Sequence, residues 1–311
     1  MSAEPREKRP TVRPADRITT PVTPTCDSVS FATPTVEPNP ARPTAARAAS
    51  LRARLSDRDL SVLHSLYVLR LMTGAQIQRL HMAGGSPGTQ ARRTRTLLQR
   101  LADMKLIVRL GRQVGGVRAG SSGYVIGLSG HGQAVLGVDG LHGGRRRRVW
   151  ETKVSFEDHV LAVSELYVSL VEAERAGILE LLDFQAEPGA WRRFPGVHGQ
   201  TITIKPDAFV RLGVGDLEHS AFIEVDMGTE SGPTIARKCD VYAKYWRSGI
   251  EQGAHDVFPR VLWLANSEHG AQRITDVLTR LSSEVQPLFH VAFLDSAVAV
   301  LTATALGGPM A

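Results

Sequence analysis

The stretch that decides the fold lies between residues 204 and 242 and carries three short signals. It reads Ile204-Lys205-Pro206-Asp207 at its start, Phe222-Ile223-Glu224-Val225-Asp226 in its middle, and Lys238-x-x-x-Tyr242 near its end. Side chains of a strand alternate between its two faces, so the two acids of the middle run point the same way. A lysine and a tyrosine four residues apart lie on one side of a helix. The stretch therefore predicts two strands and a helix that bring acids and an amine together.

A tight turn is expected to join the two strands. The runs 207–212 and 219–226 flank a glycine-rich loop in which Gly215 and Asp216 suit a two-residue hairpin turn. This turn places residue 207 directly opposite residue 224. The register also separates the side chains into an apolar face (Ala208, Val210, Leu212, Ala221, Ile223, Val225) and an acidic face (Asp207, Glu224, Asp226).

The acidic face is a candidate metal site. Three carboxylates on one patch of sheet repel each other, so the patch needs a cation, a proton or a lysine. Hard oxygen ligands of this kind suit Mg²⁺ or Mn²⁺. We therefore expect Asp207, Glu224 and Asp226 to be metal ligands.

Length and composition exclude several classes of protein. The 311 residues suffice for two domains with their own cores. No run of eighteen apolar residues predicts a membrane span, so no membrane partner is expected. The basic N-terminus lacks the apolar segment of a secretory signal. Cys26 and Cys239 form no CxxC pair, which fits a reducing cytoplasm and argues against a zinc finger or a disulfide scaffold.

Charge is distributed unevenly along the chain. Residues 51–150 carry 17 Lys and Arg against 4 Asp and Glu, a balance of +13, whereas residues 151–311 carry 13 against 22, a balance of −9. Residues 1–50 have a balance of +2 and contain nine of the seventeen prolines. We therefore expect a disordered, Pro-rich tail over 1–50, a nucleic-acid-binding domain over 51–150 and a second domain over 151–300.

The basic segment has the order of a winged helix-turn-helix. A helix starts at Ser56, a short one capped by Thr73 follows over 74–81, and a third runs over about 89–105. Strands are expected over 107–112 and 124–128, with a glycine-rich basic loop between them. In such a module the third helix enters the major groove of double-stranded DNA and the loop forms the wing.

The expected DNA contacts are polar and basic side chains of the third helix and of the wing. A solvated helix face is the ordinary meaning of such charges, but helix order, wing and charge balance together favour DNA. The run 145–148 of four arginines is a phosphate-binding linker or a flexible hinge. A homodimer and the replication or transfer proteins of a mobile element are further candidate partners. The candidate DNA-binding residues are Gln90, Arg92, Arg93, Arg95, Gln99, Arg112 and Arg118.

The second domain is predicted to be a mixed sheet flanked by helices. The fold class is therefore α+β, a winged helix followed by a mixed α/β sheet domain. Besides the hairpin, its expected elements are helices over 156–175, 234–246 and 268–281 and strands over 178–184, 257–265 and 288–294.

Over roughly residues 154–295 the chain resembles the PD-(D/E)xK, or restriction-endonuclease-like, superfamily. Asp207 follows a proline, Glu224-x-Asp226 stands at the position of the ExK motif, and Lys238 and Tyr242 match a pair of some recombination exonucleases. The whole layout is similar to the replication-relaxation family of actinobacterial plasmids and integrated elements, whose signature reads here Glu224-Val225-Asp226-Met227-Gly228-Thr229-Glu230. These resemblances imply a role in element replication or DNA processing and an Mg-dependent endodeoxyribonuclease fold.

One departure from the superfamily pattern concerns the lysine, since Asp226 stands in its place. Lys238 is the candidate to take over its role of orienting the attacking water, or it neutralises the acids of an inert scaffold. The resemblance also implies a catalytic glutamate on the first helix of the domain, for which Glu165 fits best and Glu172 is an alternative. His159 lies about 120° from Glu165 around that helix, so we expect a structural histidine.

Three functions remain open at this level. The first is a DNA-binding protein with an Mg²⁺-dependent nuclease domain or its relic. The second is a non-catalytic winged-helix transcriptional regulator, and the third is a replication accessory factor. The sequence has no GxxxxGK[ST], HExxH or GxSxG motif, which argues against an ATP-driven motor, a zinc protease and a serine hydrolase.

Overall fold

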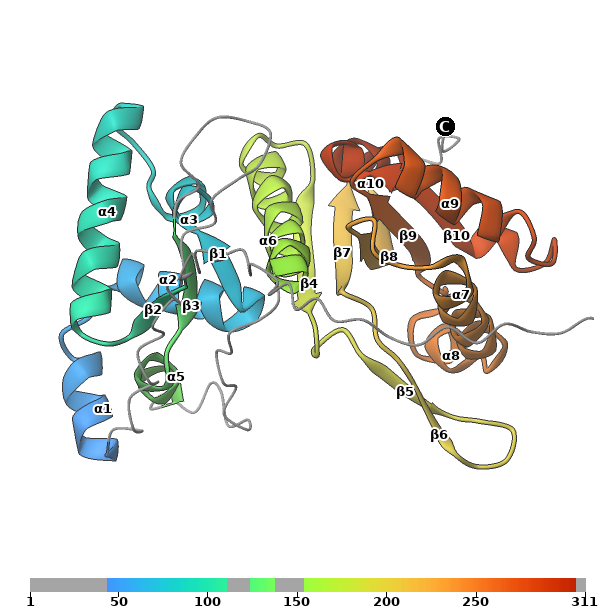
Figure 1. Cartoon of the computed structure of the whole chain (residues 1–311), viewed down its shortest axis with the longest axis horizontal. Helices are drawn as coiled ribbons and strands as arrows, with labels where there is room; N and C mark the ends of the chain where they lie inside the picture. The colour runs from blue at the N-terminus through green and yellow to red at the C-terminus, as the bar shows by residue number, and fades with distance from the viewer. Residues whose placement is uncertain (1–43, 111–123, 138–153, 306–311) are drawn as a thin grey trace, which may run out of the picture. The chain divides into compact units, whose positions relative to one another are not determined.

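The computed structural model describes residues 44–110, 124–137 and 154–305 (Figure 1). Within these ranges the chain is an α+β protein with a three-stranded sheet, a five-stranded mixed sheet and a two-stranded sheet. No helix in these ranges is both long and apolar enough to cross a membrane. The predicted wing loop, with Arg112 and Arg118, and the arginine run 145–148 lie outside the described residues.

The first helix differs from the sequence prediction. Helix α1 (Ala45–Arg52) begins inside the segment expected to be a disordered tail, with Thr44 as its N-cap. Ala48 and Leu51, one helical turn apart, are both buried. Burial of this short apolar stripe stabilises a helix whose sequence shows little amphipathic signal. The remainder of the predicted tail, residues 1–43, lies outside the described residues.

The three helices predicted for the basic segment are confirmed. They are α2 (Asp57–Leu69), α3 (Gly74–His81) and α4 (Pro87–Asp103). Ser56 and Thr73 each close a capping box with the third residue of the following helix, which satisfies otherwise unpaired backbone N–H groups. Helix α4 starts two residues earlier than expected because a proline at its first position favours helix entry.

Short strands complete this region. Strands β1 (Leu71–Thr73), β2 (Ile107–Leu110) and β3 (Val125–Leu128) form an antiparallel sheet in the order β1-β3-β2, and α5 (Gly130–Gly137) follows. The three-residue strand β1 was not predicted, because it is too short to show an alternating pattern. Helix α4 buries an apolar stripe of Thr94, Leu97, Leu98 and Leu101, with Met104 half-buried at its end.

The C-terminal region is built on the five-stranded sheet, whose order is β10-β9-β8-β7-β4. Strand β8 pairs antiparallel with β7 and parallel with β9, so the sheet is mixed as predicted. The strands are β4 (Glu180–Ala186), β7 (Ala208–Val214), β8 (Leu217–Asp226), β9 (Arg260–Ala265) and β10 (Phe289–Phe293). The helices around it are α6 (Val154–Arg175), α7 (Gly232–Arg247), α8 (Ile250–His255), α9 (Glu268–Leu278) and α10 (Ala297–Ala305).

The predicted hairpin register is confirmed. Ala208 pairs with Ile223 and Val214 pairs with Leu217, which leaves Gly215 and Asp216 as the two-residue turn. Gly215 has a φ of 59°, the left-handed conformation that such turns require at this position. The same register carried one step further sets residue 207 against residue 224.

The two faces of the sheet have different helices against them. All six predicted apolar residues of the hairpin lie in one core with residues of α6 and α10. The opposite face packs on α7 and α9 through large side chains that include Phe222, Tyr242 and Trp263. Glu224 and Asp226 alternate with the apolar residues of β8 and therefore belong to this α7 face.

Two helices and one hairpin of this region were not predicted: α8, α10 and the hairpin of β5 (Arg192–Pro195) and β6 (Thr201–Ile204). Figure 1 shows this hairpin extending from the chain between β4 and β7. Its residues Phe194 and Ile204 join the core on the α7 face. Strand β6 leads directly into the Pro206-Asp207 signal, so the hairpin borders the acidic residues.

Candidate functional site

Two acids of the predicted site lie on neighbouring strands. Asp207 stands just before β7, its backbone N–H donates to the Ile223 carbonyl at 3.0 Å, and its Oδ2 accepts from the Val225 N–H at 2.7 Å. Glu224 lies within β8, and its side chain is almost completely buried. Backbone hydrogen bonds of the hairpin therefore fix where both carboxylates sit. We call Asp207 and Glu224 the acid pair.

Helix α7 brings an amine and a phenol to the acid pair. Lys238 Nζ donates to Glu224 Oε2 at 2.7 Å and to Glu230 Oε1 at 2.5 Å. Tyr242 OH donates to Glu224 Oε1 at 2.7 Å. The ammonium also lies 5.3 Å from the ring centroid of Trp263, the partner of Glu224 in β9. Lys238 thus contacts a carboxylate of the acid pair, as predicted. Tyr242 packs in the core and also donates a hydrogen bond to Glu224.

The burial of this cluster changes its titration. Burial, followed by the charge of Asp207, raises the pKa of Glu224 to about 7, although Lys238 and Tyr242 act in the opposite direction. Burial alone lowers the pKa of Lys238, but the charges of Glu224 and Asp207 outweigh it and hold that pKa above its usual value. The lysine is therefore charged at neutral pH, while the glutamate holds its proton more strongly than an exposed glutamate does.

His159 is a site residue that sequence reasoning assigned to a structural role. It lies on α6, and its Nε2 is 3.0 Å from Asp207 Oδ1. Burial alone lowers the pKa of His159, yet the hydrogen bond and charge of Asp207 produce a net increase. The contact joins residues 48 positions apart from different elements, so no local sequence signal marks it.

Asp226 requires a correction, because its carboxylate does not join the acid pair. Its Oδ2 accepts from Arg273 Nη2 of α9 at 2.6 Å, and its Oδ1 accepts from the N–H groups of Gly228, Thr229 and Glu230 at 2.9, 3.1 and 3.2 Å. Strand β8 ends at this residue and the chain turns, with a φ of 84° at Gly228. Asp226 therefore organises the loop that presents Glu230 to Lys238.

Glu165 also lies away from its predicted place. Its carboxylate accepts from Gln76 Nε2 at 2.9 Å and forms an ion pair with Arg79, both of α3. The alternative, Glu172, binds the same guanidinium, with 2.6 Å between Arg79 Nη2 and Oε2. Both glutamates thus bind α3, and the structure does not bring either one to the acid pair.

The three-carboxylate arrangement expected from sequence is therefore only partly assembled. Within residues 44–110, 124–137 and 154–305, no group of three or more His, Cys, Asp and Glu side chains is arranged to hold a metal ion. The acid pair itself offers the hard oxygen ligands that a divalent cation prefers, since Mg²⁺ is commonly held by one or two carboxylates together with water and phosphate oxygens.

The predicted DNA-contacting residues of α4 are on the surface. Arg92, Arg93 and Arg95 are exposed, and no acid pairs with them in the described part of the chain. Gln99 is also exposed, but its amide donates to Asp103 at 2.8 Å and accepts from Arg109 at 2.9 Å. A base contact by Gln99 would require it to exchange these partners.

Gln90 differs from the arginines of α4. It is half-buried, and its amide donates to the Gly85 carbonyl at 3.4 Å. Arg109 of β2, which sequence reasoning missed, lies beside the same surface with its guanidinium 5.7 Å from the ring centroid of Tyr124. The arginines are therefore the freest of the predicted contacts.

The fold and the site together define a mixed α+β protein with a buried acid pair and a lysine beside it. Comparison with family models matches residues 63–261 to the replication-relaxation family. This match covers more than half of the chain, and the chain therefore belongs to the replication-relaxation family.

Similarity to solved structures is remote. The restriction endonuclease FokI is similar at 11% sequence identity and a TM-score of 0.25, over 86% of this chain and 44% of that chain. A similarity at this level supports no argument about mechanism. No curated protein matches the chain.

Proposed function

We propose that this protein binds double-stranded DNA and acts in the replication or processing of a plasmid or integrated element. Membership of the replication-relaxation family supports a role in replication or DNA processing. The order of α2, α3 and α4, followed by the pair β2 and β3, supports a winged-helix domain over 51–150, in which α4 enters the major groove. The exposed arginines of α4 are the groups that such a helix uses on phosphates and base edges.

For the domain over 151–300 we propose a nuclease-type acid site. One observation carries this proposal: Lys238 Nζ lies 2.7 Å from Glu224 Oε2, beside Asp207, on the buried α7 face of the sheet. Asp207 and Glu224 are the residues that would hold Mg²⁺ or Mn²⁺. When bound, such an ion activates water and stabilises negative charge on a phosphodiester.

The chain's own residues have distinct tasks in this proposal. The Val225 N–H and His159 hold the Asp207 carboxylate, and Tyr242 holds Glu224. Lys238 remains protonated and supplies a fixed positive charge for orienting the attacking water or the scissile phosphate. Asp226 and Arg273 act from outside the site by fixing the loop that carries Glu230.

Nicking of supercoiled plasmid in the presence of Mg²⁺ or Mn²⁺ tests this assignment. We expect Asp207→Asn and Glu224→Gln to abolish nicking while DNA affinity stays at the wild-type value. Asp240→Asn is the matched control, because Asp240 lies on α7 but pairs with Lys244 at the surface. Equal loss of nicking in the control, or retained nicking in both acid variants, contradicts the assignment.

A second candidate is a non-catalytic regulator or replication accessory factor with a nuclease-relic domain. The observation in its favour is that all three predicted acids already have basic partners within the chain, namely His159, Lys238 and Arg273. Tight DNA binding without metal-dependent cleavage of supercoiled, linear or single-stranded DNA would select this function.

A further inference from the structure

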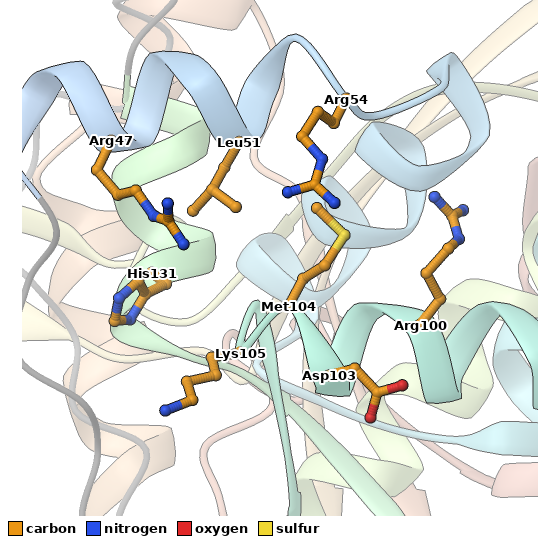
Figure 2. Close-up of a pocket in the computed structure, with 8 residues that line it drawn as sticks. All are labelled: Arg47, Leu51, Arg54, Arg100, Asp103, Met104, Lys105 and His131. Atoms are coloured by element: carbon orange, nitrogen blue, oxygen red, sulfur yellow. The ribbon is translucent and has the colours of Figure 1, made fainter.

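A basic pocket lies between α1, the C-terminal end of α4 and α5, apart from the acid pair. Its volume is about 560 Å³, and Figure 2 shows Arg47 and Arg54, from α1 and the turn after it, across the pocket from Asp103 and Lys105. Arg100 also lines it. Four permanent cations therefore border one hollow, together with a single carboxylate.

Most of this positive charge has no acidic partner among the residues that the structure describes. Arg100 pairs with the buried Asp59, and the Asp103 carboxylate accepts from Gln99. Across the three described ranges, no acid pairs with Arg47, Arg54 or Lys105. Cations gathered in this way repel each other, and an anion placed between them relieves that repulsion.

The backbone conformation of Lys105 is a second unusual feature of the pocket. It follows the C-cap of α4 with a φ of 57°, and the N–H groups of Lys105 and Leu106 donate to the carbonyls of Ala102 and Leu101. This is the helix-ending motif in which glycine is usual at the left-handed position. Ser129 Oγ donates to the Lys105 carbonyl at 2.5 Å and helps to hold the turn. This chain therefore has a lysine at a position whose left-handed backbone conformation favours glycine.

The pocket shares one lining residue with a second hollow on the proposed DNA-reading surface. Arg100 also borders a second hollow of about 770 Å³, which Arg92 and Arg93 line. From Arg95 to Lys105 the chain advances ten residues, roughly 15 Å along a helix axis. The major groove is about 12 Å wide, so an α4 inserted by its N-terminal half brings its other end to the phosphates at the groove edge.

We propose that this pocket binds a phosphate of the DNA backbone, at the edge of the groove that α4 reads. The inference rests on the proposed function, because it takes α4 as the helix that enters the groove. Arg47 and Arg54 close on the phosphate from the α1 side, and Lys105 does so from the α4 side. Helix α1 is in this view part of the DNA-binding surface rather than of a tail.

The experiment measures the affinity of the full chain for a duplex by fluorescence anisotropy between 50 and 200 mM salt. Each phosphate contact that is lost lowers the log–log salt slope by about 0.9. We expect Arg47→Ala with Arg54→Ala to weaken binding about three- to tenfold and to reduce the slope by about one contact. Arg280→Ala, an exposed cation after α9, is the matched control and leaves both quantities unchanged.

Lys105→Gly separates binding from folding. Glycine adopts the left-handed conformation without strain, so this variant keeps or raises the thermal midpoint while it weakens DNA binding. A purely structural lysine, which only favours the negative end of the α4 dipole, would give a lower midpoint and unchanged binding. That pattern overturns the inference.

Two further outcomes separate this inference from the proposed function. If the wild type fails to bind DNA, the proposed function itself is wrong. If it binds and Arg92→Ala with Arg95→Ala weakens binding, but the pocket variants do not, only the pocket assignment fails. Calorimetry with inorganic phosphate completes the test, since phosphate binding lost in the Arg47/Arg54 variant without any change in DNA affinity identifies a small-anion site and overturns the DNA contact.

Discussion

The exposed surface of α4 and the buried acid pair handle charge in opposite ways. Arg92, Arg93 and Arg95 face solvent, and no acid of the described chain pairs with them. Asp207 and Glu224 are buried, and each has a basic side chain within hydrogen-bonding distance. The first surface leaves its charges in solvent, whereas the second places a basic side chain against each acid inside the fold.

This difference predicts whether a substitution changes binding or the stability of the fold. An exposed charge without a partner contributes little to folding, so its removal should affect only binding. When one partner of a buried ion pair is removed, the other charge stays buried without compensation. Removal of such a partner should therefore lower the stability of the fold. Substitutions at the two places should therefore differ in what they change.

Arg273→Ala should cost about 3–5 kcal/mol of the free energy of unfolding, the usual range for breaking a buried ion pair. The substitution leaves Asp226, which is fully buried, with backbone N–H partners only. Urea unfolding at pH 7 measures the loss. Arg280→Ala, on the surface, should stay within about 0.5 kcal/mol of the wild type. Equal effects of the two substitutions would remove the contrast between buried and exposed charge.

Glu224→Gln should change how stability depends on pH. The raised pKa, about 7 against the ordinary 4.5, means that the folded state retains a proton that the unfolded state has released. This group therefore contributes a loss of stability as pH rises from about 4.5 to about 7, on the order of 2–3 kcal/mol in total. Glutamine carries no such proton.

Unfolding in urea with EDTA, at pH 5 and at pH 7, measures this effect as a difference between the wild type and Glu224→Gln. Other groups titrate in both proteins, and the raised pKa of His159 acts above its ordinary 6.5. The wild type should lose stability relative to the variant as pH rises. A constant difference between the two proteins means that Glu224 titrates at its ordinary value.

Tyr242→Phe should cost about 1–2 kcal/mol, because it removes the hydroxyl that donates to buried Glu224 Oε1 and leaves the ring packing intact. Thermal or urea unfolding gives the value. Tyr124→Phe is the control, since Tyr124 is about half exposed, with a relative exposure of 52%. An unchanged free energy of unfolding in Tyr242→Phe would show that the hydroxyl contributes nothing to stability and that only the ring packing does.

Arg92→Ala with Arg95→Ala should leave stability within about 0.5 kcal/mol of the wild type. DNA affinity should fall about tenfold at moderate salt, with the log–log slope reduced by about 0.9 for each phosphate contact. Anisotropy with a labelled duplex measures both. Unchanged binding would remove α4 from the interface.

The sequence was sufficient for the parts that local rules control. The turn at Gly215-Asp216 and the alternation along β8 give the hairpin register, since a one-residue slip would turn every apolar side chain to the wrong face. The capping boxes at Ser56 and Thr73 give the starts of α2 and α3. Helical periodicity placed Lys238 and Tyr242 on the side of α7 that faces the acids.

The sequence was insufficient where distant residues compete for one group. Arg273 is 47 residues from Asp226 in the sequence, yet it donates a hydrogen bond to the Asp226 carboxylate, which does not join the acid pair. Glu165 forms an ion pair with Arg79 of α3, and the α6 residue that contacts Asp207 is His159. Each of these pairings follows from helix packing, which no spacing within a single segment reveals.

Calorimetric titration of the full chain with Mn²⁺, in the wild type and in Glu224→Gln and Asp240→Asn, tests most directly whether the acid pair can take a metal. We expect one ion per chain in the wild type and in Asp240→Asn, and no binding in Glu224→Gln. Absence of binding in the wild type, or binding that Glu224→Gln leaves intact, would contradict this expectation.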